Sequence, residues 1–195
     1  LIPRSPFAEL IEEQFQPWIN ENRVNHILDI GTGSGCIAIA CALAFPHASV
    51  DAVDISPQAI AIAKRNAKEH GVADRVGIMH SDLYENLHGR QYDLIVANPP
   101  YVSTREVKAL PKEYQHEPAP GLEAGADGLD IVRRLLAQSR RHLTGNGILV
   151  TEVGYSQDAV ITAFPKLPFT WLEFARGGEG VFLLTKDQIP EYVTA

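Results

Sequence analysis

The sequence has few cysteines, no long apolar run and no excess of basic residues. Its two cysteines, Cys36 and Cys41, are five residues apart on an expected helix, so their side chains point about 140° apart and would not pair. We expect them to be buried apolar side chains in a protein of the reducing cytoplasm. No apolar run reaches the ~18 residues of a membrane-spanning helix, and the first residues lack the pattern of a signal peptide. We therefore expect no membrane partner.

The balance of charge is acidic. With 17 Lys and Arg against 24 Asp and Glu, the formal net charge is −7, whereas a self-sufficient nucleic-acid-binding domain usually presents a basic face. An acidic chain is instead compatible with a basic protein partner. The 195 residues, 45% of them hydrophobic, suit one domain with a full core. The first residue is not methionine, so we expect the sequence to begin inside a longer protein.

Short apolar runs alternate with helical stretches, a pattern typical of a parallel sheet with crossover helices. The expected strands are residues 24–30, 50–54, 76–80, 92–97 and 148–153, the expected helices are 7–20, 34–45, 56–70, 127–143 and 156–164, and a terminal hairpin joins 170–176 to 181–186. This order predicts an α/β fold with a doubly wound, mostly parallel seven-stranded sheet and an antiparallel C-terminal hairpin strand. We expect residues 1–22 to hold an entry helix and residues 23–195 to form the functional domain.

A glycine-rich loop, Asp29-Ile30-Gly31-Thr32-Gly33-Ser34-Gly35, closes the first strand and opens a helix. Glycines allow tight turns and let a ligand approach the main chain, but the third glycine is one residue too early for the dinucleotide fingerprint. Asp29 would repel a pyrophosphate and attract an ammonium group. S-adenosylmethionine carries an ammonium and a sulfonium and no phosphate, so the loop favours this cofactor over NAD. The expected cofactor contacts are Asp29, Gly31, Thr32, Gly33, Ser34 and Gly35.

Acidic residues follow the next two strands. Asp54 ends the second strand, 21 residues after Gly33 (54 − 33), and its carboxylate can accept from both ribose hydroxyls. Ile55 follows it in the expected cofactor site. After the third strand, Asp82 can accept from the adenine amino group and Leu83 can pack on the ring. Because ligands bind at strand carboxyl ends in open α/β sheets, these residues favour a nucleoside ligand over a tight turn without one.

Asn98-Pro99-Pro100-Tyr101 follows the fourth strand and begins a long loop, residues 98–126, that holds five prolines. The two prolines fix two φ angles and offer no N–H, so the segment is a stiff frame carrying one amide and one phenol. An amide or aryl-amine nitrogen is a poor nucleophile because its lone pair is delocalised. If the Asn98 side-chain oxygen and the Pro99 carbonyl hold its N–H groups, the nitrogen can aim its lone pair at a methyl donor while Tyr101 packs on the planar group. We expect Asn98 to face the cofactor as well, and no metal to be needed.

Gly31–Gly35 together with Asn98-Pro99-Pro100-Tyr101 resembles the HemK/PrmC/PrmB family of class I methyltransferases, over essentially the whole chain. Further matches are Glu117-Pro118, Gly125–Leu129, and Glu152-Val153-Gly154 followed by Gln157. The resemblance implies a Rossmann-like catalytic domain that transfers a methyl group from S-adenosylmethionine to the side-chain amide nitrogen of a protein glutamine and leaves S-adenosylhomocysteine. Family members carry a helical domain before this one, so residues 1–22 are expected to be the remnant of a linker.

Two branches of this family differ near their start. The release-factor branch typically reads Arg-Pro-Asp/Glu-Thr-Glu, whereas this chain reads Arg4-Ser5-Pro6-Phe7-Ala8-Glu9. That segment, with residues 168–174 and 177–182, resembles the branch that methylates ribosomal protein L-three of the large subunit. The resemblance implies this basic protein as the partner, either free or during ribosome assembly, with a release factor as the alternative.

Other functions stay open from the residues alone. Asn-Pro-Pro-Tyr also occurs in methyltransferases that act on exocyclic amines of adenine or guanine, but those need a basic face or a base-recognition domain. A nucleoside-binding module without chemistry would leave the proline frame unexplained. The charge around that frame favours a basic protein substrate, because residues 101–130 hold six acids against three bases: Glu106, Glu113, Glu117, Glu123, Asp127 and Asp130 against Arg105, Lys108 and Lys112.

Overall fold

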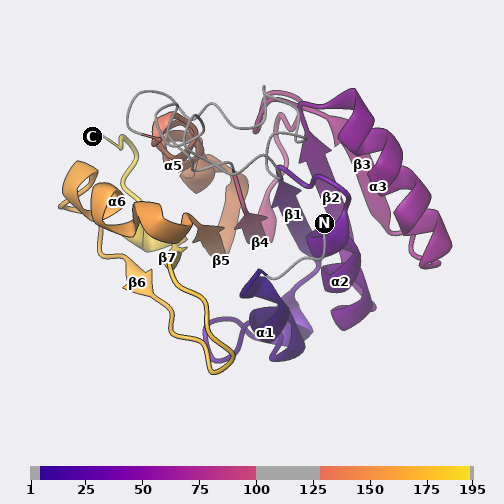
Figure 1. The fold of residues 1–195 in the computed structure, drawn as a ribbon, viewed down its shortest axis with the longest axis horizontal. Coiled ribbons are helices and arrows are strands. Elements are labelled where there is room, and N and C mark those ends of the chain that lie inside the picture. Colours follow the sequence, from indigo (N-terminus) through magenta and orange to yellow (C-terminus); the bar gives the residue numbers. More distant parts are fainter. Residues whose placement is uncertain (1–4, 100–127, 194–195) are drawn as a thin grey trace, which may run out of the picture.

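The computed structural model describes residues 5–99 and 128–193, which form one sheet covered by helices (Figure 1). The sheet has the order β3-β2-β1-β4-β5-β7-β6. Its strands are β1 (His26–Ile30), β2 (Ser49–Asp54), β3 (Val76–His80), β4 (Tyr92–Ala97), β5 (Leu143–Glu152), β6 (Thr170–Trp171) and β7 (Val181–Thr185). Strands β1 to β5 pair in parallel, and β7 is antiparallel to β5 and β6. The predicted doubly wound sheet with an antiparallel C-terminal hairpin is confirmed.

Helices lie on both faces of the sheet (Figure 1). They are α1 (Phe7–Glu12), α2 (Cys36–Ala44), α3 (Pro57–Glu69), α5 (Asp130–His142) and α6 (Gln157–Ala163), with short 3-10 turns η1 (Glu21–Arg23), η4 (Gly154–Ser156) and η5 (Lys186–Gln188). Residues alternate between the faces, so Ile27 packs with α1 and α2 while Leu28 packs with α5 and α6. Both faces are buried, which explains why the strands read as apolar runs.

The strand register brings several loops to one edge of the sheet. Ile30 pairs with Val53 on one side and with Ala97 on the other, and Ala97 pairs with Thr151. The chain therefore leaves β1, β2, β4 and β5 at the same side, which we call the carboxyl edge. The opposite side, where these strands begin, is the amino edge. The strand order reverses between β1 and β4, which is where ligands bind in this type of fold.

Local sequence signals placed some elements correctly. The Ser56 hydroxyl accepts from the Ala59 N–H at 3.3 Å, and Pro57 occupies the first position of α3, as expected for a helix start. Strands β3 and β4 have the predicted bounds, and most other bounds differ by one or two residues. The two cysteines are free; Cys41 is buried and Cys36 is half-buried.

The expected entry helix over residues 7–20 is wrong beyond Glu12. Gln14 and Phe15 have φ angles of 51° and 57°, outside the helical region, and Pro17 has no N–H to continue a helix. Phe15 is fully buried between Phe7 and Phe45. The chain therefore buries this ring through a turn, because tertiary packing outweighs the helical spacing of the apolar residues.

Two further predictions need correction near β5 and the hairpin. The strand expected over residues 148–153 begins earlier, because residues 143–147 are also part of β5; the register shifts there from Tyr92 opposite Leu143 to Leu94 opposite Ile148, so the extra residues form a bulge. The expected strand 170–176 ends at Trp171. The N–H groups of residues 175 and 176 donate to the Glu9 carboxylate at 2.8 and 3.1 Å instead of continuing the strand pairing.

Candidate active site

The glycine loop turns the chain from β1 into α2. Gly31, Gly33 and Gly35 have φ angles of 71°, 55° and 83°, which side-chain-bearing residues rarely adopt. The Gly31 N–H donates to the Val53 carbonyl at 2.9 Å, which ties the loop to the end of β2. A Cβ on Gly35 would lie 3.1 Å from the Cβ of Ala63, so glycine lets α2 pack against α3, while a Cβ on Gly33 would meet nothing within 4 Å. The loop therefore offers open main chain at Gly33.

Asp29 lies beneath this loop and is only 1% exposed. Its Oδ2 accepts from the Thr32 hydroxyl at 2.6 Å and from the Ala38 N–H at 3.1 Å. Its Oδ1 is buried and has no hydrogen-bond partner among the described residues. Burial raises the pKa of Asp29 to about 6, against the lowering effect of these hydrogen bonds. The carboxylate therefore fixes the loop with one oxygen and keeps the other as an unfilled acceptor.

Asp54 joins the end of β2 to the glycine loop. Its Oδ2 accepts from the Gly33 N–H and its Oδ1 from the Ser56 N–H, both at 2.8 Å. Each oxygen keeps a further lone pair, and the side chain is partly open to solvent. Ile55 beside it is 53% exposed. Asp54 therefore contacts the glycine loop, Asp54 and Ile55 are both accessible to a ligand, and their roles at the cofactor stay predictions.

Asp82 and Leu83 follow β3 at the same edge. Asp82 forms an ion pair of 2.8 Å with Arg134 on α5, a partner that the sequence did not predict. Leu83 is buried and has a φ of 50°, and its carbonyl accepts from the Ser81 hydroxyl at 2.9 Å. Because a carboxylate has about four acceptor positions, the ion pair leaves room for a further donor. Their roles at adenine stay predictions.

Asn98 lies directly after β4 and beside the glycine loop. A Cβ on Gly31 would lie 3.9 Å from the Asn98 carbonyl oxygen, so the two motifs that the sequence singled out meet at the carboxyl edge. Asn98 is half-buried and Pro99 is buried. Pro100 and Tyr101, which were also predicted to be catalytic, lie outside the described residues, as do residues 101–127 with most of the predicted acids.

Three further residues at this edge were not predicted to belong to a site. Glu152 ends β5, is 8% exposed, and accepts from the Ser5 hydroxyl at 2.5 Å; burial raises its pKa, partly offset by that hydrogen bond. Thr151 keeps a buried hydroxyl with no partner among the described residues. The Asn66 side chain donates to the Ser34 carbonyl at 2.8 Å and braces the loop. An acid at the end of a buried strand was the signal that could have found Glu152, whereas Asn66 gave none.

The sheet order, the glycine loop and the adjoining Asn98 define a Rossmann-like methyltransferase domain. The family model described as the methyltransferase small domain matches residues 12–113, which is more than half of the chain. The chain belongs to this family, which confirms the methyltransferase class that the motifs predicted.

Known proteins similar to this chain agree with that assignment. The ribosomal protein uL3 glutamine methyltransferase of Francisella tularensis is 50% identical over 196 residues, covering 100% of this chain and 62% of that protein. The chain spans 59–64% of the length of the curated relatives that it matches.

Solved structures share the fold at lower identity. The ribosomal protein L11 methylase of Lactobacillus delbrueckii has a TM-score of 0.60 and 23% identity, covering 91% of this chain and 74% of that one. An RNA methyltransferase of Salinibacter ruber, in complex with S-adenosylhomocysteine, has a TM-score of 0.58 and 20% identity, covering 99% and 95%.

Proposed function

We propose that this chain is the catalytic domain of a protein glutamine methyltransferase. It transfers a methyl group from S-adenosylmethionine to the side-chain amide nitrogen of a glutamine in ribosomal protein uL3, the large-subunit protein L-three. The observation that carries the proposal is the contact between the glycine loop and Asn98 at the carboxyl edge. The choice of substrate is supported by the 50% identity with a uL3 glutamine methyltransferase. We place the reaction in the cytoplasm.

The described residues fit S-adenosylmethionine. Asp54 keeps lone pairs for the two ribose hydroxyls, and the unfilled Oδ1 of Asp29 provides negative charge for the ammonium group. Gly33 leaves the main chain open for close approach, and exposed Ile55 provides an apolar surface for the adenine. When bound, the cofactor supplies an electrophilic methyl group. The Salinibacter ruber enzyme, which shares the fold, binds its demethylated product.

Asn98 and Pro99 orient the target amide. The Asn98 side-chain oxygen and the Pro99 carbonyl accept hydrogen bonds from the two N–H groups of the glutamine side chain, so its nitrogen can leave planarity. Positive charge develops on that nitrogen during attack, and acceptors already in position stabilise it without reorganisation. Because β4 is a central strand next to β1 and is buried except at Asp93, it holds these acceptors rigidly relative to the glycine loop.

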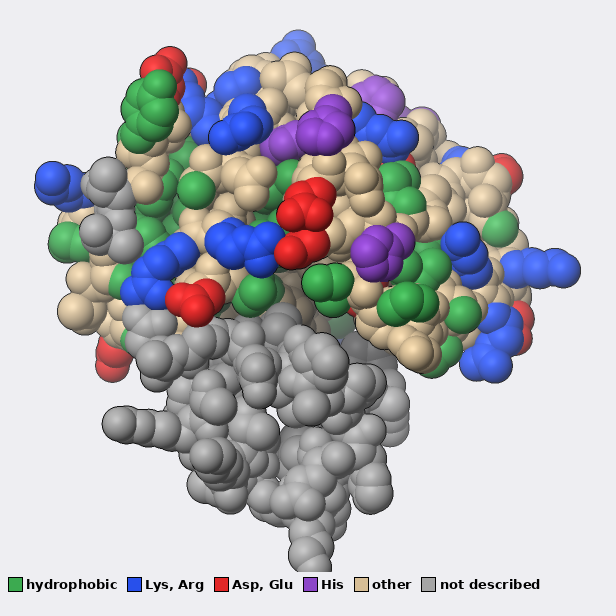
Figure 2. Space-filling model, turned by 90° about the horizontal axis from the view of Figure 1, so that it is seen from above, with side chains coloured by type: hydrophobic (Ala, Val, Ile, Leu, Met, Phe, Trp, Pro, Cys, Tyr) green, Lys and Arg blue, Asp and Glu red, His purple; other side chains and the backbone are tan. Residues whose placement is uncertain are grey.

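Charge on the described surface argues against a nucleic-acid substrate. Figure 2 shows the face over α5, where acidic side chains lie between the basic ones. Arg133 and Arg134 of α5 are paired with Asp130 and Asp82 at 3.3 and 2.8 Å. Nucleic acid is usually bound by rows of unpaired cations, and these two cations of α5 are partly neutralised by neighbouring acids.

Methyl transfer with labelled S-adenosylmethionine tests the proposal. The substrates are unmethylated uL3, unmethylated ribosomes, a release factor and DNA and RNA oligonucleotides at matched salt, followed by mass mapping of the product. We expect label on one glutamine of uL3. Faster labelling of oligonucleotides than of uL3 would contradict the proposal and indicate methylation of exocyclic amines in nucleic acid. Faster labelling of the release factor would indicate that a release factor, and not uL3, is the substrate.

A further inference from the structure

The chain turns sharply directly after β5, and the hairpin before β7 holds this turn in place. Gly154 has a φ of 50°, and a Cβ on Gly180 would overlap the carbonyl of Gly154, so the two main chains are in direct contact. The Val153 N–H donates to the Gly180 carbonyl at 2.7 Å. The Ser156 N–H donates back to Val153 at 3.0 Å. The turn is therefore rigid, because both of its sides are fixed by main-chain contacts.

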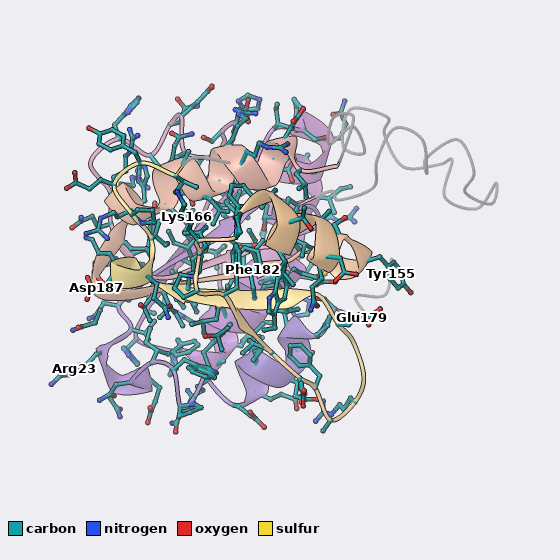
Figure 3. The ribbon with its side chains drawn as sticks, turned by 90° about the vertical axis from the view of Figure 1, so that its left-hand side faces the viewer. Arg23, Tyr155, Lys166, Glu179, Phe182 and Asp187 are labelled. Atoms are coloured by element: carbon teal, nitrogen blue, oxygen red, sulfur yellow. The ribbon has the colours of Figure 1, made fainter. Side chains whose placement is uncertain are left out.

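Tyr155 lies on this turn with 90% of its surface exposed. Figure 3 shows Tyr155 and Glu179 at one end of the sheet and Arg23 and Asp187 at the other. Glu179 directly precedes Gly180, and Asp158 lies three residues after Tyr155 in the first turn of α6. Both acids are exposed, and neither forms an ion pair with a described residue. The turn thus presents an exposed aromatic ring, with one acid three residues further along the chain and another on the adjoining hairpin.

This ring lies close to the proposed reaction centre. Thr151 pairs with Ala97, the residue before Asn98, and Tyr155 follows Thr151 by four residues. Adjacent strands are about 4.8 Å apart and each residue spans at most about 3.6 Å, so Tyr155 lies within about 20 Å of Ala97, which is bonded to Asn98. An extended peptide with its glutamine at Asn98 covers that distance with about six residues.

We propose that Tyr155, together with Glu179 and Asp158, binds a Lys or Arg side chain of the protein substrate within about six residues of the methylated glutamine. The inference rests on the proposed function and names how its substrate is selected. The face of a tyrosine ring attracts a cation, and the two carboxylates add negative charge to the same turn and hairpin. A rigid turn loses little conformational entropy on binding, and exposed aromatics of this kind often dominate the energy of protein interfaces.

Substitutions at Tyr155 and Glu179 test this inference in the full chain, with unmethylated uL3 as substrate. We expect Tyr155→Ala to raise KM about tenfold, equivalent to 1.4 kcal/mol, with kcat and the affinity for S-adenosylhomocysteine unchanged. Tyr155→Phe should restore most of the loss because it keeps the ring, and Glu179→Gln should raise KM less. The matched controls are Tyr192→Ala, at a tyrosine that is 84% exposed, and Asp187→Asn at the opposite end; both should leave KM unchanged.

A double-mutant cycle identifies the partner side chain. Replacing each Lys or Arg near the mapped glutamine of uL3 with Ala should raise KM for the wild-type enzyme at one position. At that position the same change should have little further effect with Tyr155→Ala, since the interaction is already lost. Additive effects at every position, or a wild-type KM in Tyr155→Ala, would overturn the inference and leave the proposed function standing. If the wild-type protein methylates no glutamine, the proposed function itself is wrong.

Discussion

The two edges of the same sheet differ in how completely their polar groups are satisfied. At the amino edge, Asp93 accepts from the Asn25 N–H at 2.8 Å, the His26 N–H at 3.0 Å and the Thr144 hydroxyl at 2.9 Å. At the carboxyl edge, Asp29 keeps a buried oxygen without a partner among the described residues. Asp93 stabilises the fold, whereas the unfilled acceptor of Asp29 costs stability unless a ligand uses it.

Neither backbone strain nor cavity volume follows the same division, because Gln14 and Phe15, which lie away from the carboxyl edge, also have positive φ angles. The carboxyl edge holds Leu83 at a φ of 50° as well as the three glycines of the loop, the type of strain that gathers at functional sites. A cavity of about 470 Å³ lies instead at the amino edge, lined by residues that include Trp18, Arg23 and Asn146. The unfilled acceptor of Asp29 beside the glycine loop therefore locates the candidate chemistry better than cavity size does.

Among substitutions that test the difference between the two edges, we expect the largest effect on activity at Asn98. Asn98→Ala removes the acceptor for the target amide and should lower kcat about 10²–10³-fold, or about 2.7–4 kcal/mol, by analogy with the loss of one transition-state hydrogen bond. Affinity for S-adenosylhomocysteine should stay near wild type, measured by calorimetry. Asn146→Ala, an asparagine at the amino edge, is the matched control. Wild-type turnover in Asn98→Ala would rule out the proposed role.

A second effect concerns the pH dependence of stability through Asp29. Its pKa is raised from 3.8 to about 6 in the folded state, so the native chain holds this proton where the unfolded chain has released it. The contribution of this proton to the free energy of unfolding is complete below pH 4. It is lost as the pH rises to about 6, and the loss is about 3 kcal/mol at most. Urea titrations at several pH values give the free energy of unfolding of the wild type and of Asp29→Asn. The wild-type value minus the Asp29→Asn value should fall as the pH rises over this range. A difference that does not change with pH would show that folding does not raise the pKa of Asp29.

Substitutions of Asp54 and Asp93 should affect different properties, cofactor binding in the first case and the free energy of unfolding in the second. Asp54→Ala is expected to weaken S-adenosylmethionine binding by about 1–3 kcal/mol, because it removes charge-assisted hydrogen bonds to the ribose. Asp93→Ala should leave binding unchanged and lower the free energy of unfolding by a similar amount, because three donors lose their acceptor. Calorimetry and urea titration of both variants measure the two effects. Equal affinity in Asp54→Ala and the wild type would exclude the ribose assignment.

The smallest effect is electrostatic. We expect kcat/KM on free uL3 to fall as salt rises while kcat changes less, because an acidic enzyme steers a basic substrate through screened charges. Reversing the charge of Glu106, Glu113 and Glu117 should flatten this salt dependence, whereas Glu21→Lys at the amino edge should not. A kcat/KM of the wild type that does not change with salt would show that electrostatic steering does not contribute to substrate association.

Local patterns predicted the fold where local forces decide it. The Ser56-Pro57 helix start and the apolar strands each depend on neighbours in the sequence, and they were found. The entry helix and the long hairpin strand were wrong because distant contacts decide them. Phe15 packs on Phe45, thirty residues away, and Glu9 takes the N–H groups of residues 175 and 176.

The same limit applies to the candidate site. Asp29 and Asp54 stood out because each is an acid directly at a strand end beside glycines, a signal contained in a few residues. The Asp82 ion pair joins residues 82 and 134, and the Ser5–Glu152 hydrogen bond joins residues 147 apart. Asp82 follows β3 and Arg134 is on α5, while Ser5 precedes α1 and Glu152 ends β5, so these partners meet only in the folded chain and spacing in the sequence could not reveal them.

Mapping the binding of S-adenosylhomocysteine by amide chemical shifts and hydrogen exchange tests most directly the claim that the carboxyl edge is the active site. The ligand should perturb and protect Gly31–Gly35, Asp54-Ile55 and Asp82-Leu83, and should leave Trp18, Arg23 and Asn146 unchanged. Perturbation centred on the amino-edge cavity, with the glycine loop unaffected, would contradict the account.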